Sequence, residues 1–151
     1  NSYALLWFRR ITQMNKVKSI VNKIPEFCMT HWLIRIPLIV VFLQQGLAKW
    51  PIDAETAASF ELTLLVWTFV VLGEIGGAVG LVVGGLLDYV KRFKEFGDLI
   101  TRFSGIVITG IMTGVIWMSE PESFTYVLLY DNFHVLLWVG GMYFALRGNR
   151  T

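Results

Sequence analysis

The chain has 151 residues, of which 55% are hydrophobic and only 16% are charged, and its net charge at pH 7 is +2. Soluble domains carry about 25% charged residues, so this composition favours a membrane protein, and the small net charge gives no support to a nucleic-acid-binding function. The single cysteine, Cys28, excludes an internal disulfide and any CxxC metal or redox motif.

Residues 1–27 are predicted to form a basic amphipathic arm. Apolar side chains recur at helical spacing from Trp7 to Ile24, with basic side chains largely between them, and Pro25 ends the pattern. This is typical of a helix that lies in the lipid headgroup region. The alternative is a basic tail that becomes ordered only against a partner. No small-residue cleavage site of a signal peptide is present, and the first residue is Asn, so we expect the native start to lie upstream.

Residues 28–151 are predicted to form a transmembrane domain of four helices, at about residues 30–48, 61–87, 99–118 and 123–146. Each is long enough to cross a hydrocarbon core of ~30 Å. Pro37 predicts a mild kink in the first helix. Residues 88–97 form a charged, aromatic connection, and Pro121 lies in a tight acidic turn before the last helix. The predicted fold class is an all-α membrane protein, a four-transmembrane-helix bundle preceded by an interfacial helix.

The basic residues are distributed unevenly over these spans. Of the 13 basic residues, 11 fall in the arm, the 88–102 region or the C-terminus, while Lys49 lies at the opposite end and Arg35 within the first helix. By the positive-inside rule, both termini are predicted to lie in the cytoplasm of a bacterial-type inner membrane.

Glycines in the second and third helices recur four residues apart. This small-xxx-small spacing lets another helix approach closely in lipid. The glycines predicted to form helix-packing surfaces are Gly73, Gly76, Gly77, Gly80, Gly84, Gly110 and Gly114.

Five polar residues within the spans are candidates for a buried polar network or a ligand site: Arg35, Gln45, Glu74, Asp131 and His134. Glu74 and His134 fall near the midplane, so we expect Glu74 to pair with His134 or with Arg35. Asp131 and His134 share a helix face.

Three interpretations of this network stay open. These groups could hydrogen-bond across helices and fix the packing, contact a quinone headgroup or a lipid, or relay protons, since histidine titrates near neutral pH. His134 could also be a single axial ligand of a pigment. The acidic residues and His134 lack metal-site spacing, and the sequence has no phosphate-binding loop and no nucleophile with an adjacent base. We therefore predict no catalytic residue, no metal and no soluble substrate for this chain alone.

The transmembrane region resembles the DoxX/DoxD family of small four-helix membrane proteins. The resemblance is carried by Arg35 in a first helix ending Gln45-Gly46-Leu47-Ala48-Lys49-Trp50, by the glycine pattern from Glu74 to Gly80, by Thr101-Arg102 and by Ala145-Leu146-Arg147-Gly148. It covers roughly residues 30–150 and leaves the basic arm unmatched. The resemblance implies Arg35, Glu74 and Lys49 as characteristic polar positions, association with quinone-linked redox partners, and no metal or haem held by this chain.

The function expected from these features is an integral-membrane accessory subunit, DoxX-like, of a larger redox or energy-converting complex. The first alternative is a quinone-interacting subunit of a membrane oxidoreductase, and the second is a small oligomeric transporter. The expected partners are the lipid bilayer and other membrane subunits.

Overall fold

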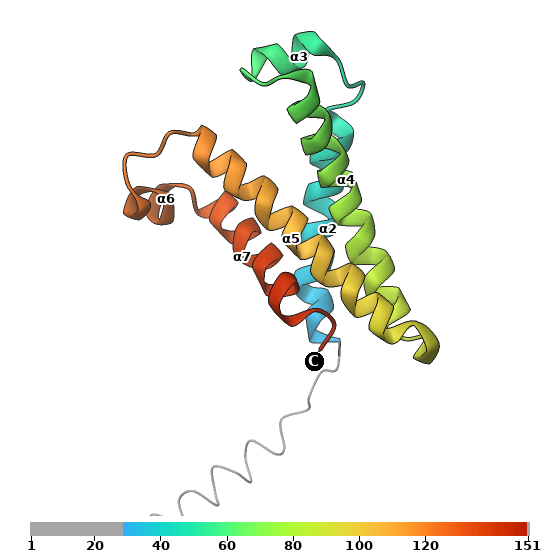
Figure 1. Cartoon of the computed structure of the whole chain (residues 1–151). Helices are drawn as coiled ribbons and strands as arrows, with labels where there is room; N and C mark the ends of the chain where they lie inside the picture. The colour runs from blue at the N-terminus through green and yellow to red at the C-terminus, as the bar shows by residue number, and fades with distance from the viewer. Residues whose placement is uncertain (1–28, 151) are drawn as a thin grey trace, which may run out of the picture.

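The computed structural model describes residues 29–150, which form helices joined by turns, with no strand in that range (Figure 1). The all-helical fold predicted from the sequence is thus found, and the amphipathic helix predicted for residues 1–27 lies outside the described residues. In chain order the elements are α2 (Thr30–Ala48), α3 (Ala54–Ser59), α4 (Leu64–Leu87), the 3-10 helix η1 (Lys91–Phe93), α5 (Lys94–Met118), α6 (Phe124–Tyr130) and α7 (Asn132–Arg147).

Three helical stretches of the described chain are long and apolar enough to cross a membrane: Thr30–Ala48, Leu64–Leu87 and Lys91–Met118. They indicate a membrane protein. The prediction of a fourth continuous helix over residues 123–146 is wrong, because the helix is interrupted at Asp131. α7 has 16 residues, so its length is about 24 Å, less than the ~30 Å of a hydrocarbon core.

The interruption between α6 and α7 follows from two short polar side chains. The Asp131 carboxylate lies 2.6 Å from Nδ1 of His134, and the Asn132 amide donates to the backbone carbonyl of Leu129 at 3.3 Å. Side chains that bond to nearby groups in this way compete with the helical backbone and favour helix ends over helix interiors.

Two other helices begin at positions different from those predicted. Glu61 has a positive φ of 57° and cannot belong to an α-helix, so α4 begins only at Leu64, where the Thr63 side chain caps the N–H of Val66. α5 begins at Lys94 rather than near residue 99. Its first turns are charged, and the sequence pattern therefore resembled a loop.

The short helix α3 lies beyond the end of α2 and caps itself. The Asp53 carboxylate accepts the backbone N–H of Thr56 at 2.7 Å and the Thr56 hydroxyl at 2.8 Å. The hydrogen bond from the Thr56 backbone lowers the pKa of Asp53 below its usual value. Asp53 thus stabilises α3 at neutral pH, and this contribution is lost as the pH falls through the lowered pKa.

α5 is the central helix of the fold: α4 packs along it, α7 packs along it as well, and α2 packs against α4. Gly73, Gly77, Gly80 and Gly84 lie where α4 meets α5, because a Cβ at each would contact a side chain of α5. The packing role predicted for Gly76, Gly110 and Gly114 is not seen, since a Cβ at these positions would meet nothing within 4 Å. The main core cluster consists of Leu38, Phe42, Ala78, Leu81, Ile108, Met112, Leu137 and Phe144, and a second cluster consists of Ala57, Trp67 and Val71.

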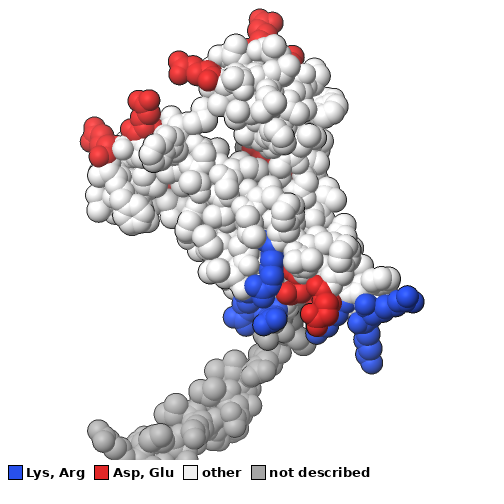
Figure 2. Space-filling model, in the orientation of Figure 1, with Lys and Arg blue, Asp and Glu red and all other residues white. Residues whose placement is uncertain are grey.

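The charged residues gather at opposite ends of the bundle (Figure 2). We name each end after the charge that predominates there. The basic end is defined by Lys91, Arg92, Lys94, Arg102, Arg147 and Arg150, and the acidic end by Asp53, Glu55, Glu120 and Glu122. The basic end also holds three carboxylates, those of Asp88, Glu95 and Asp98. At the acidic end the helices separate into two arms, one carrying α3 and the other carrying α6 (Figure 1), and the molecular surface is hollowed between them (Figure 2).

Candidate functional site

A buried ion pair joins α4 to the end of α2. The Lys49 ammonium lies 2.8 and 2.9 Å from the two carboxylate oxygens of Glu74 and donates to the backbone carbonyl of Gln45 at 3.2 Å. The side chain of Glu74 is 4% exposed and that of Lys49 is 20% exposed. Charge-assisted hydrogen bonds of this kind satisfy a carboxylate that would be costly to bury alone.

The pairing expected for Glu74, with His134 or with Arg35, is wrong. The hydrogen bonds to its carboxylate in the described chain come from Lys49. The prediction chose partners for Glu74 by their depth along the predicted spans. Lys49 lies past the end of the first helix and was therefore not considered, but its long aliphatic side chain lets the ammonium reach back to α4. Lys49 was expected as a characteristic residue only through the DoxX/DoxD resemblance.

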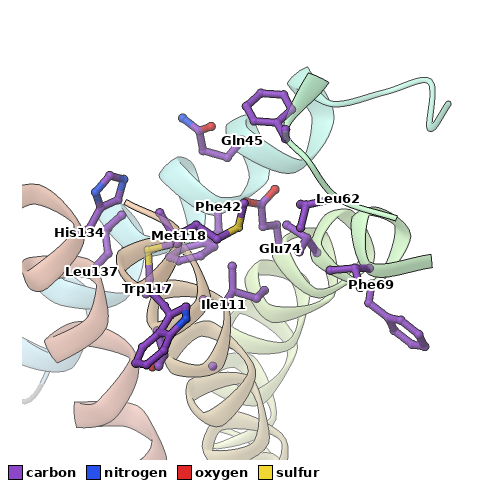
Figure 3. A pocket seen from close by; sticks show the side chains of 18 of the residues that line it. Phe42, Gln45, Leu62, Phe69, Glu74, Ile111, Trp117, Met118, His134 and Leu137 are labelled. Carbon is purple, nitrogen blue, oxygen red and sulfur yellow. The ribbon is translucent and has the colours of Figure 1, made fainter. Parts of the chain in front are cut away.

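The ion pair lines a cavity of about 950 Å³ between the two arms, which we call the acidic-end cavity. Figure 3 shows His134 and Leu137 on one side of it and Glu74 and Leu62 on the other. α2, α4, α5 and α7 all contribute to its lining, which is mainly apolar. The polar side chains in the lining are Gln45, Lys49, Glu74, Thr113, Ser119 and His134.

The cavity explains two of the glycines that do not pack. Gly110 and Gly114 of α5 both line it, so the absence of neighbours around them reflects open space rather than a helix contact. Trp67 lines the opposite wall, stacks on Phe60 with ring centres 5.0 Å apart, and has a buried indole N–H with no hydrogen-bond partner in the described chain. Because this N–H is buried, it does not face the open space of the cavity.

Asp131 and His134 form a pair of their own at the rim. His134 Nδ1 lies 2.6 Å from Asp131, and the exposed fractions of the two side chains are 38% and 24%. One turn further along α7, the Trp138 indole donates to the Thr113 hydroxyl at 2.9 Å. Of the five candidate residues, Gln45, Glu74 and His134 thus line one cavity, and Asp131 joins them through His134.

Arg35 belongs to a different cluster, near the basic end. It is fully buried, and its guanidinium donates to the carbonyl of Leu81, to the Thr101 hydroxyl at 3.3 Å and to Oδ1 of Asn149 at 2.6 Å. The guanidinium carbon also lies 4.6 Å from the centre of the Phe144 ring, within the range of a cation–π contact. Arg35 therefore ties α2 to α4, α5 and the C-terminal residues.

Asn149 is a residue whose role the sequence did not reveal. Besides accepting from Arg35, it accepts from the Thr101 hydroxyl at 2.8 Å, donates through its side chain to the carbonyl of Gly84 at 2.8 Å and donates through its backbone N–H to Asp98 at 2.7 Å. It follows Gly148, whose φ is +65°, so the chain turns back onto the bundle. A Gly-Asn pair after a helix signals a helix end, but not this inward direction.

Arg102 closes α7 in the same region. It pairs with Asp98 at 2.8 Å and donates to the terminal carbonyls of α7, including that of Arg147 at 3.0 Å. A cation there satisfies orphan carbonyls and opposes the negative end of the helix dipole. Asn149 links Arg102 to the Arg35 cluster, because it bonds to Arg35 and Thr101 and, through its backbone N–H, to the Asp98 carboxylate that pairs with Arg102.

The described residues contain no group of three or more His, Cys, Asp or Glu side chains placed to hold a metal ion. The polar groups of the acidic-end cavity can instead donate and accept hydrogen bonds at the bottom of an apolar space. Comparison with family models, with curated proteins and with solved structures finds no match for this chain.

Proposed function

We propose that this chain is a quinone-interacting, DoxX-like integral-membrane subunit of a larger redox complex, with its basic end in the cytoplasm of a bacterial-type inner membrane. The observation that carries the proposal is the acidic-end cavity, in which the Lys49–Glu74 pair lies among apolar walls. Its volume, about 950 Å³, falls within the range of small-molecule sites.

The polar and apolar residues of the cavity suit the headgroup and the tail of a quinone, respectively. Quinone carbonyls accept hydrogen bonds, which the amide of Gln45 can donate, and a quinol hydroxyl can donate to Glu74. The Lys49 ammonium can donate to a quinone in exchange for one of its three present hydrogen bonds, two to Glu74 and one to the Gln45 carbonyl. The apolar walls and the open side suit an isoprenoid tail that continues into lipid. A bound quinone supplies two-electron, two-proton redox chemistry. The side chains of the cavity exchange protons and not electrons, so the proposal includes partner subunits that carry the redox centre.

Titration of the purified chain with a short-tailed benzoquinone tests the site. The full chain in lipid nanodiscs would be titrated while tryptophan fluorescence is followed, since Trp67 and Trp117 line the cavity and quinones quench indoles. We expect saturable quenching, and Glu74→Gln and Lys49→Gln should each weaken binding by about tenfold, the loss of one buried charged hydrogen bond. Glu55→Gln, an exposed carboxylate on α3, is the matched control. Quenching that is linear in quinone and identical in all four proteins would contradict the proposal.

The alternative is an accessory subunit that contributes packing and no ligand contact. It is favoured by the large exposed apolar side chains on the spanning helices, including Leu33, Phe69 and Phe103, which leave area for neighbouring helices. Native gels of gently solubilised membranes, compared for wild type and Glu74→Gln, separate the two. Loss of turnover in a complex of unchanged size supports the quinone site, and loss of the complex supports the accessory role. A small colourless species in the wild type would contradict both.

A further inference from the structure

The connection between α4 and α5 has the composition of a membrane-surface element. It runs over residues 89–96, Tyr-Val-Lys-Arg-Phe-Lys-Glu-Phe, and includes η1. It lies at the basic end of the bundle, between two helical stretches long enough to cross a membrane (Figures 1 and 2). A connection between two such spans is expected at the level of the lipid headgroups. We call it the basic aromatic turn.

The aromatic side chains of this segment are exposed on the surface of the chain. The exposed fractions are 57% for Tyr89, 46% for Phe93 and 57% for Phe96. Phe93 is the last residue of η1, and Phe96 lies in the first turn of α5. Tyr89 is held in place by a hydrogen bond of 2.9 Å from the Trp32 indole. Aromatic rings at this depth are typical of the headgroup boundary.

Its cations are also largely unused by the protein. Lys91, Arg92 and Lys94 are exposed, and the nearest ion pair that any of them makes within the described chain is Lys94 with Asp88 at 4.0 Å. Arg102 of the same end is different, because its guanidinium is taken up by Asp98 and by the carbonyls of α7. The guanidinium carbon of Arg92 lies 5.9 Å from the centre of the Phe93 ring, and the segment also contains one exposed carboxylate, Glu95. The basic aromatic turn thus presents three exposed cations and one carboxylate beside three exposed rings.

We propose that the basic aromatic turn is a binding site for anionic phospholipid headgroups. The rings insert at the boundary between headgroups and acyl chains, and the three cations bind lipid phosphates and other anionic headgroup oxygens. A cation near an anionic membrane surface gains about 1 kcal/mol, or roughly fivefold in affinity. The role is separate from the acidic-end cavity, which lies at the other end of the bundle.

Native mass spectrometry of the purified full chain in detergent tests this site directly. The chain would be titrated with phosphatidylglycerol and, separately, with phosphatidylcholine of the same acyl chains, and bound lipids would be counted. We expect a preference for phosphatidylglycerol that falls at least about tenfold in the triple variant Lys91→Gln, Arg92→Gln and Lys94→Gln. The preference should persist in the charge-conserving variant Lys91→Arg, Arg92→Lys and Lys94→Arg.

A matched control removes the other two exposed cations of the same end, by Arg147→Gln and Arg150→Gln. Loss of the preference in this control but not in the triple variant would overturn the proposal, as would equal counts of the two lipids in wild type. Full competition by inorganic phosphate at millimolar concentration would show a free-anion site and would overturn the lipid assignment. If the triple variant does not fold, the three single variants replace it, and an unchanged preference in all three contradicts the proposal.

Discussion

Two cations of this bundle, the half-buried Lys49 and the fully buried Arg35, have different kinds of partner. Lys49 is paired with a carboxylate, whereas Arg35 has neutral oxygens and an aromatic ring around it and no carboxylate within 4.0 Å among the described residues. Its Nε already has no partner in that part of the chain. Since a buried charge without acceptors is very costly, each remaining acceptor of Arg35 matters more than an ordinary hydrogen bond.

Asn149→Leu should therefore be strongly destabilising. The change removes the Oδ1 acceptor of Arg35 and the donor to the Gly84 carbonyl, and we expect a loss of about 2–4 kcal/mol in the free energy of unfolding. Thermal unfolding in detergent, followed by circular dichroism, measures it. Gln44→Leu is the control, because Gln44 is an exposed amide. Equal stability of the two variants would show that Arg35 does not depend on Asn149.

The Lys49–Glu74 pair should behave as a coupled unit in stability as well as in binding. Glu74→Ala leaves the Lys49 ammonium, 20% exposed, without its carboxylate, and we expect a loss of about 1–3 kcal/mol, less than for a fully buried pair because the ammonium can reach water. Lys49→Met combined with Glu74→Ala removes both charges and should recover part of that loss. A double-mutant cycle on the unfolding free energies measures the coupling, and additive single effects would contradict it.

At the scale of the elements, the contacts of α5 decide which glycines matter. A Cβ at Gly105 would lie within 2.8 Å of backbone atoms of α7, including those of Gly141 and Phe144. Backbone atoms of a packed helix cannot move aside as a flexible side chain can. Gly110, on the same helix, faces the acidic-end cavity and meets nothing.

Gly105→Ala and Gly110→Ala should consequently have opposite effects on stability. Gly105→Ala forces α5 and α7 apart, and we expect a loss of about 2–3 kcal/mol, as for other overpacked positions. Gly110→Ala gains helix propensity, by up to about 1 kcal/mol. Thermal unfolding of the two variants under identical detergent conditions makes the comparison. A destabilised Gly110→Ala would show that another helix fills the cavity at that point.

The positions of Gly105 and Gly110 in the structure illustrate which features could be predicted from the sequence and which could not. Spans in α2, α4 and α5 were predicted because long apolar stretches must form helices in lipid. Gly105 was not predicted as a packing position because no glycine lies four residues from it. Gly110 was predicted as one because Gly114 lies four residues away. The spacing identifies a helix face without bulky side chains, but it does not show whether another helix packs on that face. The partner of Glu74 depends on how far the Lys49 side chain reaches, and the partners of Asn149 depend on the turn at the end of the chain. Neither can be deduced from the depth of a residue along a span.

At the scale of the whole molecule, the two ends differ in both charge and packing. α2, α4, α5 and the end of α7 are tied together at the basic end by Arg35 and Asn149, while the arms at the acidic end are separate and enclose the cavity. A bundle closed at one end and open at the other fits a ligand that enters from the open half. The depth at which the interruption at Asp131 lies in the membrane determines which residues around the acidic-end cavity face water.

Labelling of single cysteines with a membrane-impermeant maleimide measures that placement. In a Cys28→Ser background, Asn132→Cys and Leu136→Cys compare two exposed positions on α7 that differ in depth by about 6 Å. With the helix interrupted, we expect Asn132→Cys to react from the same side as Glu122→Cys, and Leu136→Cys to stay unreacted in lipid. Lys91→Cys should react only after the membrane is opened, because the basic end is proposed to face the cytoplasm. If Asn132→Cys is as inert as Leu136→Cys, the interruption at Asp131 lies within the membrane, and the acidic-end cavity faces lipid. If Lys91→Cys reacts from outside, the orientation is the reverse of the proposed one.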